Sequence, residues 1–415
     1  MPAPPRLSAR HGARVLRISA ETRFLVAAGV SFYGDWLTTV ALVVLLYRAT
    51  GSPTGPALYI LVRVAPRLFG PAPGGVLADR MGPARIAATC AVIQGVLTAS
   101  MVVFAHTHVI AAIYVAVAAA QFLNSLAQPA WGALIPRVAS KERLGRTNGI
   151  YAGLFESGIL VAPAIGALVL PHTTPEALIV VDAASFLVAA LLLGSLALPR
   201  SAEPQLLSGR GVFAGVPIVL RDRMLRSLAV GQLATAAVIT TLQAVLVVAA
   251  SQHFGRDVDV GWLYAGVGAG GLLGVIPVIR RTPIHVGGLG IVIATIGSIA
   301  PLALFVLVTN LALAFGLLLI SSLAGTLWET RGWIGLQQRV ADDLLGRTNA
   351  VIRLAMYIGM LAGAVAAVTM VRPLGWEATV LIVCGACGLI LGVSTLLGPA
   401  ERPAAQLSPI DWPPL

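Results

Sequence analysis

Eight charged side chains lie inside long apolar runs of this 415-residue sequence. A charged side chain at the centre of a membrane helix costs about 2.5–3.5 kcal/mol on insertion scales, so such a charge is expected only where it has a role. The roles open to these groups are proton uptake and release and the exchange of ion-pair partners. The eight residues are Asp35, Arg63, Arg67, Glu156, Asp182, Glu329, Arg331 and Arg353.

Three of these charges share one depth. Asp35, Arg67 and Glu156 lie nine to eleven residues from the Arg-rich ends of their runs, which is about 15 Å at the rise of an α-helix. Because Arg67 can pair with one acid at a time, the other acid is left without a cation and takes up a proton more readily. We therefore predict that Asp35 and Glu156 exchange protons and that Arg67 switches between them. Arg63, one helical turn away, supplies a second cation. A permanent Asp35–Arg67 ion pair is the alternative.

The remaining charges are interpreted from their depth. Glu329 and Arg353 each lie six residues from the Arg-rich end of a run, which predicts an ion pair that acts as an inner gate. Arg331 is expected to reach the lipid headgroups. Asp182 lies near the opposite end of its run, where it can reach water, and no role is predicted for it. Further polar contacts are expected from Asn124, Gln128 and Tyr357.

The elements that position these side chains follow from the composition. Only 11% of the residues are charged and 57% are hydrophobic, with a mean hydropathy of +0.89, whereas a soluble domain carries about 25% charged and 45–50% apolar residues. The apolar runs reach the ~20 residues of a bilayer-spanning helix and lack the alternation of membrane barrel strands. An all-α membrane protein is therefore predicted, with twelve transmembrane helices at residues 24–47, 54–77, 84–105, 109–134, 147–170, 176–198, 225–250, 258–280, 284–308, 310–335, 347–371 and 375–398.

The distribution of Lys and Arg sets the predicted orientation, because cytoplasmic loops of membrane proteins retain positive charge. Of the 28 basic residues, 21 lie on the side that holds both termini, and three lie on the other side: Arg48, Arg256 and Arg372. This predicts a multi-pass protein of the cytoplasmic membrane with both termini in the cytoplasm. It also accounts for the net charge of +11 without a nucleic-acid partner.

Two copies of one cytoplasmic turn indicate an internal duplication. The segment Leu144–Asn148 (LGRTN) recurs as Leu345–Asn349, six predicted helices further on. Two six-helix bundles repeated in the same orientation are typical of an alternating-access carrier, whose site lies between the halves near the bilayer midplane. The predicted division is a cytoplasmic segment (1–23), a first bundle (24–198), a linker (199–224), a second bundle (225–398) and a cytoplasmic tail (399–415).

The loop between the second and third predicted helices carries a family motif. The sequence GVLADRMG, which runs from Gly75 to Gly82, resembles the signature loop of the major facilitator superfamily, and the resemblance covers nearly the whole chain. In that family the loop is taken to hold the inner ends of the two halves together in the outward-open state. The resemblance implies a latch made by Gly75, Asp79, Arg80, Gly82 and Arg85. Gly75 is expected to permit close helix approach, and Asp79 to accept hydrogen bonds from helix-terminal amides.

The fifth predicted helix carries a pattern of small residues. Gly158, Ala162, Pro163 and Gly166 resemble the antiporter motif of the same superfamily, which is associated with exporters. Small residues at every fourth position allow helices to pack closely. The start of the first helix, from Ser31 to Asp35, is similar to the superfamily branch that contains macrolide-efflux and siderophore-exporter proteins. The cargo does not follow from this similarity.

These features predict secondary active export of a hydrophobic or amphipathic small molecule, a drug-like compound or secondary metabolite, by proton antiport. A siderophore or lysophospholipid cargo, import of a small metabolite, and a non-transporting sensor or scaffold remain alternatives. No enzymatic activity, cofactor or metal is expected, because the sequence offers no nucleophile–base set and no nucleotide-binding loop. The CxxC pair of Cys384 and Cys387 lacks a second ligand pair and is interpreted as packing. A monomer is expected, with protons, the cargo and the bilayer as partners.

Overall fold

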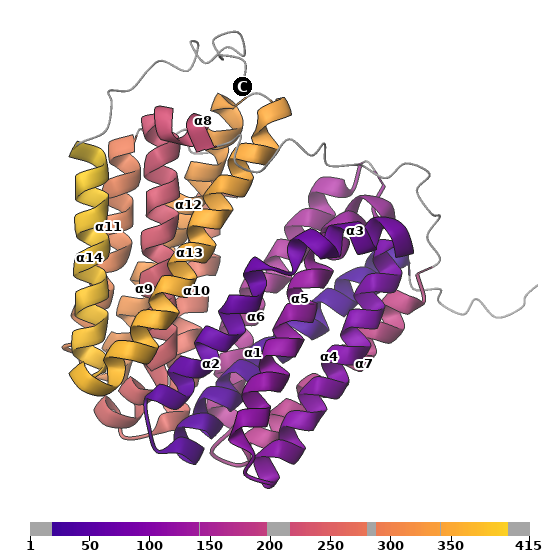
Figure 1. The fold of residues 1–415 in the computed structure, drawn as a ribbon, viewed down its shortest axis with the longest axis horizontal. Helices are drawn as coiled ribbons and strands as arrows, with labels where there is room; N and C mark the ends of the chain where they lie inside the picture. Colours follow the sequence, from indigo (N-terminus) through magenta and orange to yellow (C-terminus); the bar gives the residue numbers. More distant parts are fainter. Residues whose placement is uncertain (1–18, 141, 197–215, 280–287, 341, 397–415) are drawn as a thin grey trace, which may run out of the picture.

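The computed structural model describes residues 19–140, 142–196, 216–279, 288–340 and 342–396, and the regular structure in these ranges is helical (Figure 1). The first half contains α1 (Ala20–Thr50), α2 (Thr54–Val64), the 3₁₀ helix η1 (Ala65–Leu68), α3 (Pro71–Met81), α4 (Pro83–His106), α5 (Ile110–Val138), α6 (Leu144–Val169) and α7 (Pro175–Gly194). The second half contains α8 (Val216–Arg221), α9 (Arg223–His253), the 3₁₀ helix η3 (Asp257–Asp259), α10 (Val260–Ile279), α11 (Gly288–Phe305), α12 (Leu311–Arg339), α13 (Asp342–Leu374) and α14 (Trp376–Leu396).

The prediction of an all-α membrane protein with twelve spans in two bundles is confirmed. Among the described residues, nine helices are individually long and apolar enough to cross a membrane. Helices α2, η1 and α3 together make the second span, α10 makes another, and the described part of α11 contributes a shorter apolar helix, Thr295–Phe305. Most of the predicted N-terminal segment and linker, and all of the predicted tail, lie outside the described residues.

The second span differs from the single helix predicted at 54–77. It runs to Met81 and is interrupted by the 3₁₀ turn η1. Pro66 lies in that turn and has no backbone N–H to donate, while its carbonyl accepts from the amides of Phe69 at 3.1 Å and Gly70 at 3.3 Å. Arg63 therefore belongs to α2 and Arg67 to η1, which gives the two cations different surroundings.

The first membrane-spanning helix of each half, α1 or α9, forms the centre of its bundle. The segments Val40–Leu46 of α1 and Ala244–Ala250 of α9 are at most 6% exposed. Both belong to one apolar cluster that continues from the first half into the second. In α1 and α9 most of the apolar stretch is buried inside the protein, whereas α6, α12 and α13 leave more of theirs on the surface. These two stretches thus hold their side chains away from lipid.

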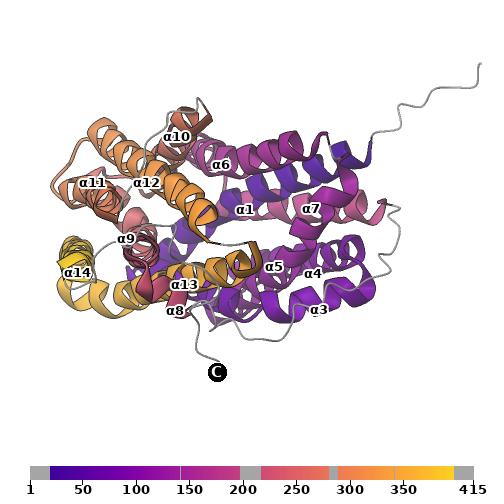
Figure 2. The ribbon, with the colours of Figure 1, turned by 90° about the horizontal axis from the view of Figure 1, so that it is seen from above.

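The two halves lie side by side and diverge toward the end that carries α3 and α8 (Figures 1 and 2). At the opposite end they meet, and an ion pair joins Arg48 at the end of α1 to Asp257 at the start of η3. The guanidinium donates twice, with its Nη2 at 2.8 Å from Oδ1 and its Nε to Oδ2. The end with few basic residues is therefore closed, and the Arg-rich end is open.

Asp257→Asn is expected to loosen the closed end, because it removes the charge that Arg48 contacts. An exposed ion pair contributes at most about 1 kcal/mol, so the population open at this end is expected to rise by up to about fivefold. Distances between spin labels on the α1–α2 and α9–α10 connections, measured by double electron–electron resonance, report this population. The exchanged pair Arg48→Asp with Asp257→Arg serves as the control and is expected to restore closure. An unchanged distance distribution in Asp257→Asn contradicts the gating role.

Candidate functional site

A small polar cavity lies inside the first half. Side chains of α1, α2, α4, α5 and α7 surround it, and it encloses about 20 Å³, which is room for about one water molecule. Its walls combine ionisable and hydroxyl or amide groups with a few apolar ones. The polar residues that line it are Asp35, Thr38, Thr39, Tyr59, Arg63, Gln94, Thr98, Gln121 and Asp182.

Asp35 and the two predicted cations are near one another but do not form the predicted ion pair. Asn124 Nδ2 donates to Asp35 Oδ2 at 3.4 Å. Arg63 is held with its guanidinium 5.1 Å from the centre of the Trp36 ring, and Arg67 Nη2 donates to Gln121 Oε1 at 3.5 Å. Both arginines interact electrostatically with Asp35, at a distance longer than that of an ion pair. The structural alternative, a permanent Asp35–Arg67 pair, is not present in this conformation.

Asp182 of α7 belongs to this cavity, and the expectation that it reaches water at the membrane edge is wrong. Its side chain lines the same space as Asp35 and Arg63, and the residue is only 1% exposed. Ser185 Oγ donates to its Oδ1 at 3.0 Å. The reason is the packing of α7 against α1, where Gly34 leaves space for the carboxylate. Ser185, one turn away on the same face, was the available sequence signal.

Glu156 lies in a different place from Asp35. Its Oε2 approaches the position that a Cβ on Gly271 of α10 would occupy, at 2.9 Å. The neighbouring charge that acts on it is another acid, Glu329 of α12. The structure thus does not bring Glu156 to Arg67, and the predicted exchange of one arginine between two acids does not fit this arrangement. Helix α6 turns Glu156 toward the second half, whereas η1 holds Arg67 against α5.

The predicted inner gate is also arranged differently. Glu329 and Arg353 do not form an ion pair with each other; both contact Trp333 instead. The Trp333 Nε1 donates to Glu329 Oε1 at 3.3 Å, and the Arg353 guanidinium lies 5.5 Å from the centre of the Trp333 ring. Arg353 Nε also donates to Asn349 Oδ1 at 3.2 Å. In this open conformation the indole separates the two charges, so the gate role stays a prediction.

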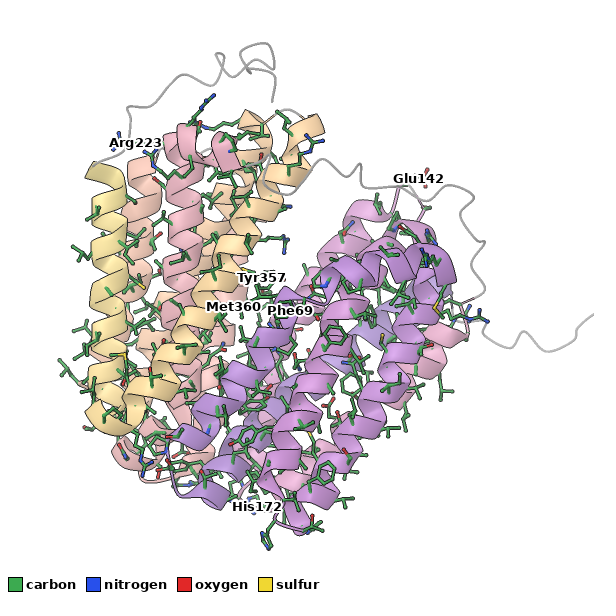
Figure 3. All side chains as sticks on the ribbon, viewed as in Figure 1. Phe69, Glu142, His172, Arg223, Tyr357 and Met360 are labelled. Atoms are coloured by element: carbon green, nitrogen blue, oxygen red, sulfur yellow. The ribbon has the colours of Figure 1, made fainter. Side chains whose placement is uncertain are left out.

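Tyr357 lies at the boundary between the halves. It lies with Met360 on α13, on the side of the second half that faces the first (Figure 3), and α13 contacts α2 and η1 of the first half. Asn124 contacts Asp35 as described, whereas Gln128, one turn further along α5, is exposed. The polar contact expected of Tyr357 stays a prediction.

The signature loop is open to solvent in this conformation. Asp79, Arg80 and Arg85 are exposed and make no hydrogen bond or ion pair with the described part of the chain. Gly82 has φ of +89°, a conformation that favours glycine, and it ends α3. The close helix approach expected at Gly75 is not present in this conformation, because no atom lies within 4 Å of the position that a Cβ on Gly75 would occupy.

Gly74, not Gly75, makes the close helix contact in that loop. A Cβ on Gly74 would be 2.0 Å from the Leu126 carbonyl oxygen of α5. α3 therefore needs glycine at residue 74 in order to pack against α5. Successive side chains of a helix point about 100° apart. A shift of one residue in the sequence therefore changes which glycine faces the neighbouring helix.

The small residues of α6 pack against two neighbours. Gly158 and Gly166 face Phe32 and Val40 of α1. On another side, a Cβ on Gly261 of α10 would be 2.4 Å from the Pro163 carbonyl oxygen. Ala162 is fully buried. Of the antiporter-like residues, Gly158 and Gly166 thus pack within the first half, and Pro163 contacts the second half at Gly261.

Gly261 and Gly268 complete this interface and were missed in the sequence. A Cβ on Gly268 would be 2.4 Å from the Leu160 amide nitrogen of α6. Their spacing of seven residues places them on one face of α10, which was the available signal.

Among the described residues, no group of three His, Cys, Asp or Glu side chains is placed to hold a metal ion. Cys384 and Cys387 are buried and carry free thiols.

A comparison with protein families gives one match over most of the chain: a model of the Major Facilitator Superfamily matches residues 24–343. The chain is 24% identical over 266 residues to the multidrug efflux pump Tap of Mycobacterium tuberculosis strain ATCC 25618 / H37Rv, covering 61% of this chain and 63% of the pump. It is 24% identical over 264 residues to Tap of Mycolicibacterium fortuitum, covering 61% of this chain and 64% of that pump. The matches thus span less than two thirds of these relatives.

Solved structures share the fold. The nucleoside transporter NupG is 15% identical, with a TM-score of 0.71 over 91% of this chain and 98% of that one. A bacterial homologue of the human lysosomal transporter Spinster, in its inward-facing and unoccupied conformation, is 16% identical, with a TM-score of 0.64 over 93% of this chain and 94% of that one. At these identities the likeness concerns the arrangement of the helices.

Gly34→Ala is expected to destabilise the folded protein, because the added Cβ would lie 2.2 Å from Asp182 Oδ1 and 2.3 Å from Ser185 Oγ. Overpacking of this kind typically costs about 1–3 kcal/mol. Thermal unfolding in detergent measures the change. Gly153→Ala on α6 is the control, because open space surrounds that position and alanine favours a helix. Equal unfolding temperatures for Gly34→Ala and the unmodified protein would show that α7 does not pack as described.

Proposed function

Because the chain belongs to the Major Facilitator Superfamily, we propose that it is a secondary active transporter that exports a hydrophobic or amphipathic small molecule by proton antiport. The membrane is the cytoplasmic membrane, the termini face the cytoplasm, and the protein acts as a monomer. The name of the Tap relatives supports export of drug-like compounds, and so do the antiporter-like residues between Gly158 and Gly166. A siderophore or a lysophospholipid is the alternative cargo.

The observation that carries proton coupling is the shared cavity of Asp35, Asp182 and Arg63. The two carboxylates line it with one guanidinium, and the second guanidinium nearby, Arg67, lies outside the wall and donates to Gln121, so neither acid has a direct ion-pair partner when both are ionised. A poorly solvated interior penalises that state, so binding of one proton relieves it. A scaffold protein would gain stability from apolar residues at these positions, which disfavours a non-transporting role.

Arg67 provides the link from this cavity to the second half. It lies outside the cavity wall on η1, which contacts α13 of the second half, and its charge acts on Asp35. A proton on Asp35 weakens the attraction between Asp35 and Arg67, so Arg67 is freer to interact with α13. The proton thereby favours one arrangement of the halves over the other. Such a difference between the two states is what couples proton and cargo movement.

Glu156 and Glu329 supply a second proton-dependent contact, between the halves. Glu156 is on α6 of the first half and Glu329 on α12 of the second. Two ionised acids repel each other across this boundary, whereas one proton removes the repulsion. Helices α6, α10 and α12 can then approach more closely. The role of Glu156 as a proton-exchange residue is therefore kept, with Glu329 in place of Arg67 as its partner.

Glu156→Gln is expected to abolish pH-driven transport while the protein remains in the membrane, because the amide cannot bind and release a proton. The measurement is accumulation of a fluorescent amphipathic dye in everted vesicles, with and without a pH gradient. Glu142→Gln is the matched control, because Glu142 is exposed in the turn before α6 and its variant is expected to retain coupling. Unchanged coupling in Glu156→Gln rules out the assignment.

Asp35→Asn is expected to abolish proton-driven accumulation of the dye and to leave exchange of the dye across the membrane intact. With residue 35 permanently neutral, the halves can still move, so exchange of dye between two equal concentrations continues while accumulation against a gradient is lost. Both rates are measured in the same proteoliposomes. Loss of both activities in correctly folded protein would contradict a role confined to coupling. Accumulation in right-side-out vesicles in place of everted ones would establish import.

A further inference from the structure

A long groove runs along the membrane-facing side of the first half, separate from the polar cavity. It encloses about 950 Å³ and is formed by α1, α6 and α7. On α1 it extends from Ser19 to Leu37, which corresponds to about 27 Å of helix. It therefore reaches from the Arg-rich end of the bundle into the depth of the membrane.

The deep part of the groove is apolar and open to the surroundings. Val26, Ile150, Val181 and Val188 line it and are between 36% and 52% exposed. Side chains of this kind, at this depth and facing outward, are in contact with hydrocarbon. The space between them fits an acyl chain, and the hydroxyls deeper in the groove, those of Tyr33 and Ser185, are already donated to Ser157 and Asp182.

The mouth of the groove is basic. Arg143 and Arg146 line it at the start of α6, and both are exposed. Glu21 offsets part of this charge, because it accepts from Arg143 Nη1 at 3.5 Å and from Thr147 Oγ1 at 2.7 Å. Arg146 makes no hydrogen bond or ion pair with the described residues. The mouth thus keeps one net positive charge, beside a helix start that has no side-chain cap.

We propose that this groove binds one anionic phospholipid of the cytoplasmic leaflet. Its phosphate lies against Arg146 and Arg143, and an acyl chain follows α1 between α6 and α7. The charge at the mouth complements an anionic headgroup, and basic pockets between transmembrane helices on this side of a membrane are a known mode of headgroup binding. The proposal rests on the cytoplasmic placement of the Arg-rich end and is independent of the cargo and of proton coupling.

The inner end of the groove gives this lipid a structural consequence. Gly34 and Ser185 line the groove, and the Ser185 hydroxyl donates to the buried Asp182 carboxylate at 3.0 Å. These residues alone therefore separate this part of the groove from the polar cavity. An acyl chain in the groove keeps water away from Asp182 on the membrane side.

Native mass spectrometry of the purified full chain tests the proposal. Dioleoyl phosphatidylglycerol is compared with dioleoyl phosphatidylcholine, which has the same chains and no net charge. One Arg near an anionic surface accounts for about a fivefold change in affinity, so Arg146→Gln is expected to weaken phosphatidylglycerol binding about fivefold and to leave phosphatidylcholine binding unchanged. Arg347→Gln is the matched control, because Arg347 is the repeat counterpart of Arg146 and lies outside the groove.

A second variant tests the place of binding. Ala184 is exposed on the groove wall, and Ala184→Trp fills the groove without entering the core. It is expected to remove the tightest phosphatidylglycerol site while thermal stability in detergent stays the same. Glycerol phosphate, which has the headgroup charge and no acyl chains, is expected not to compete. Equal phosphatidylglycerol affinity in Arg146→Gln and the unmodified protein overturns the proposal, and so does full binding by Ala184→Trp or effective competition by glycerol phosphate.

Discussion

The cost of holding charge in an apolar bundle is the constraint on which the rest of this structure depends. Asp35, Asp182 and Arg63 share a cavity with room for about one water, inside a helix bundle whose surroundings are hydrocarbon. Ionised groups in such a place need compensating charges and hydrogen bonds. Ser185 and Asn124 supply hydrogen bonds to the two acids. The helices that surround the cavity must therefore hold their positions closely, and Gly34 is the residue that makes room for it.

The boundary between the halves meets a different physical requirement: the two bundles must pack closely, and their contacts must be able to break again. Glycines of α10 place its backbone directly against α6 at Pro163 and Leu160, which gives many weak contacts and little polar attachment. Two acids at this boundary, Glu156 and Glu329, repel each other when both are charged. An attractive pair, Arg48 with Asp257, closes the opposite end. Charge therefore opposes closure of the two halves at the level of Glu156 and Glu329 and favours it at the level of Arg48 and Asp257.

The membrane-facing surface is also organised by charge and depth. Along α1, α6 and α7 the groove is basic where lipid headgroups lie and apolar below them. Two of these helices, α1 and α7, also line the polar cavity that holds Asp182. A lipid at this position would thus be part of the wall of the polar cavity, and the composition of the bilayer would bear on the state of the buried acids. This gives the first half two faces with distinct chemistry, separated by a single layer of side chains.

Much of this protein was determined by the sequence alone. Apolar run length, Lys and Arg distribution and the repeated LGRTN turn predict helices, their number and the twofold division, because each of these depends on local composition and on the thickness of a bilayer. The same reasoning predicted one depth for Asp35, Arg67 and Glu156. Depth depends on position along one helix, so it can be predicted by counting residues from the end of that helix.

Only the tertiary structure decided which residues meet. Helices that are apolar on every side carry no periodic signal of which face points inward, so Asp182 was placed at the surface, and Gly75 was chosen in place of Gly74. For the same reason Arg67 was paired with Glu156, although η1 and α6 turn these side chains toward different neighbours. Contacts such as Trp333 between Glu329 and Arg353 depend on the rotation of one helix relative to another. That rotation is set by the packing of all the helices together, which no single segment of the chain contains.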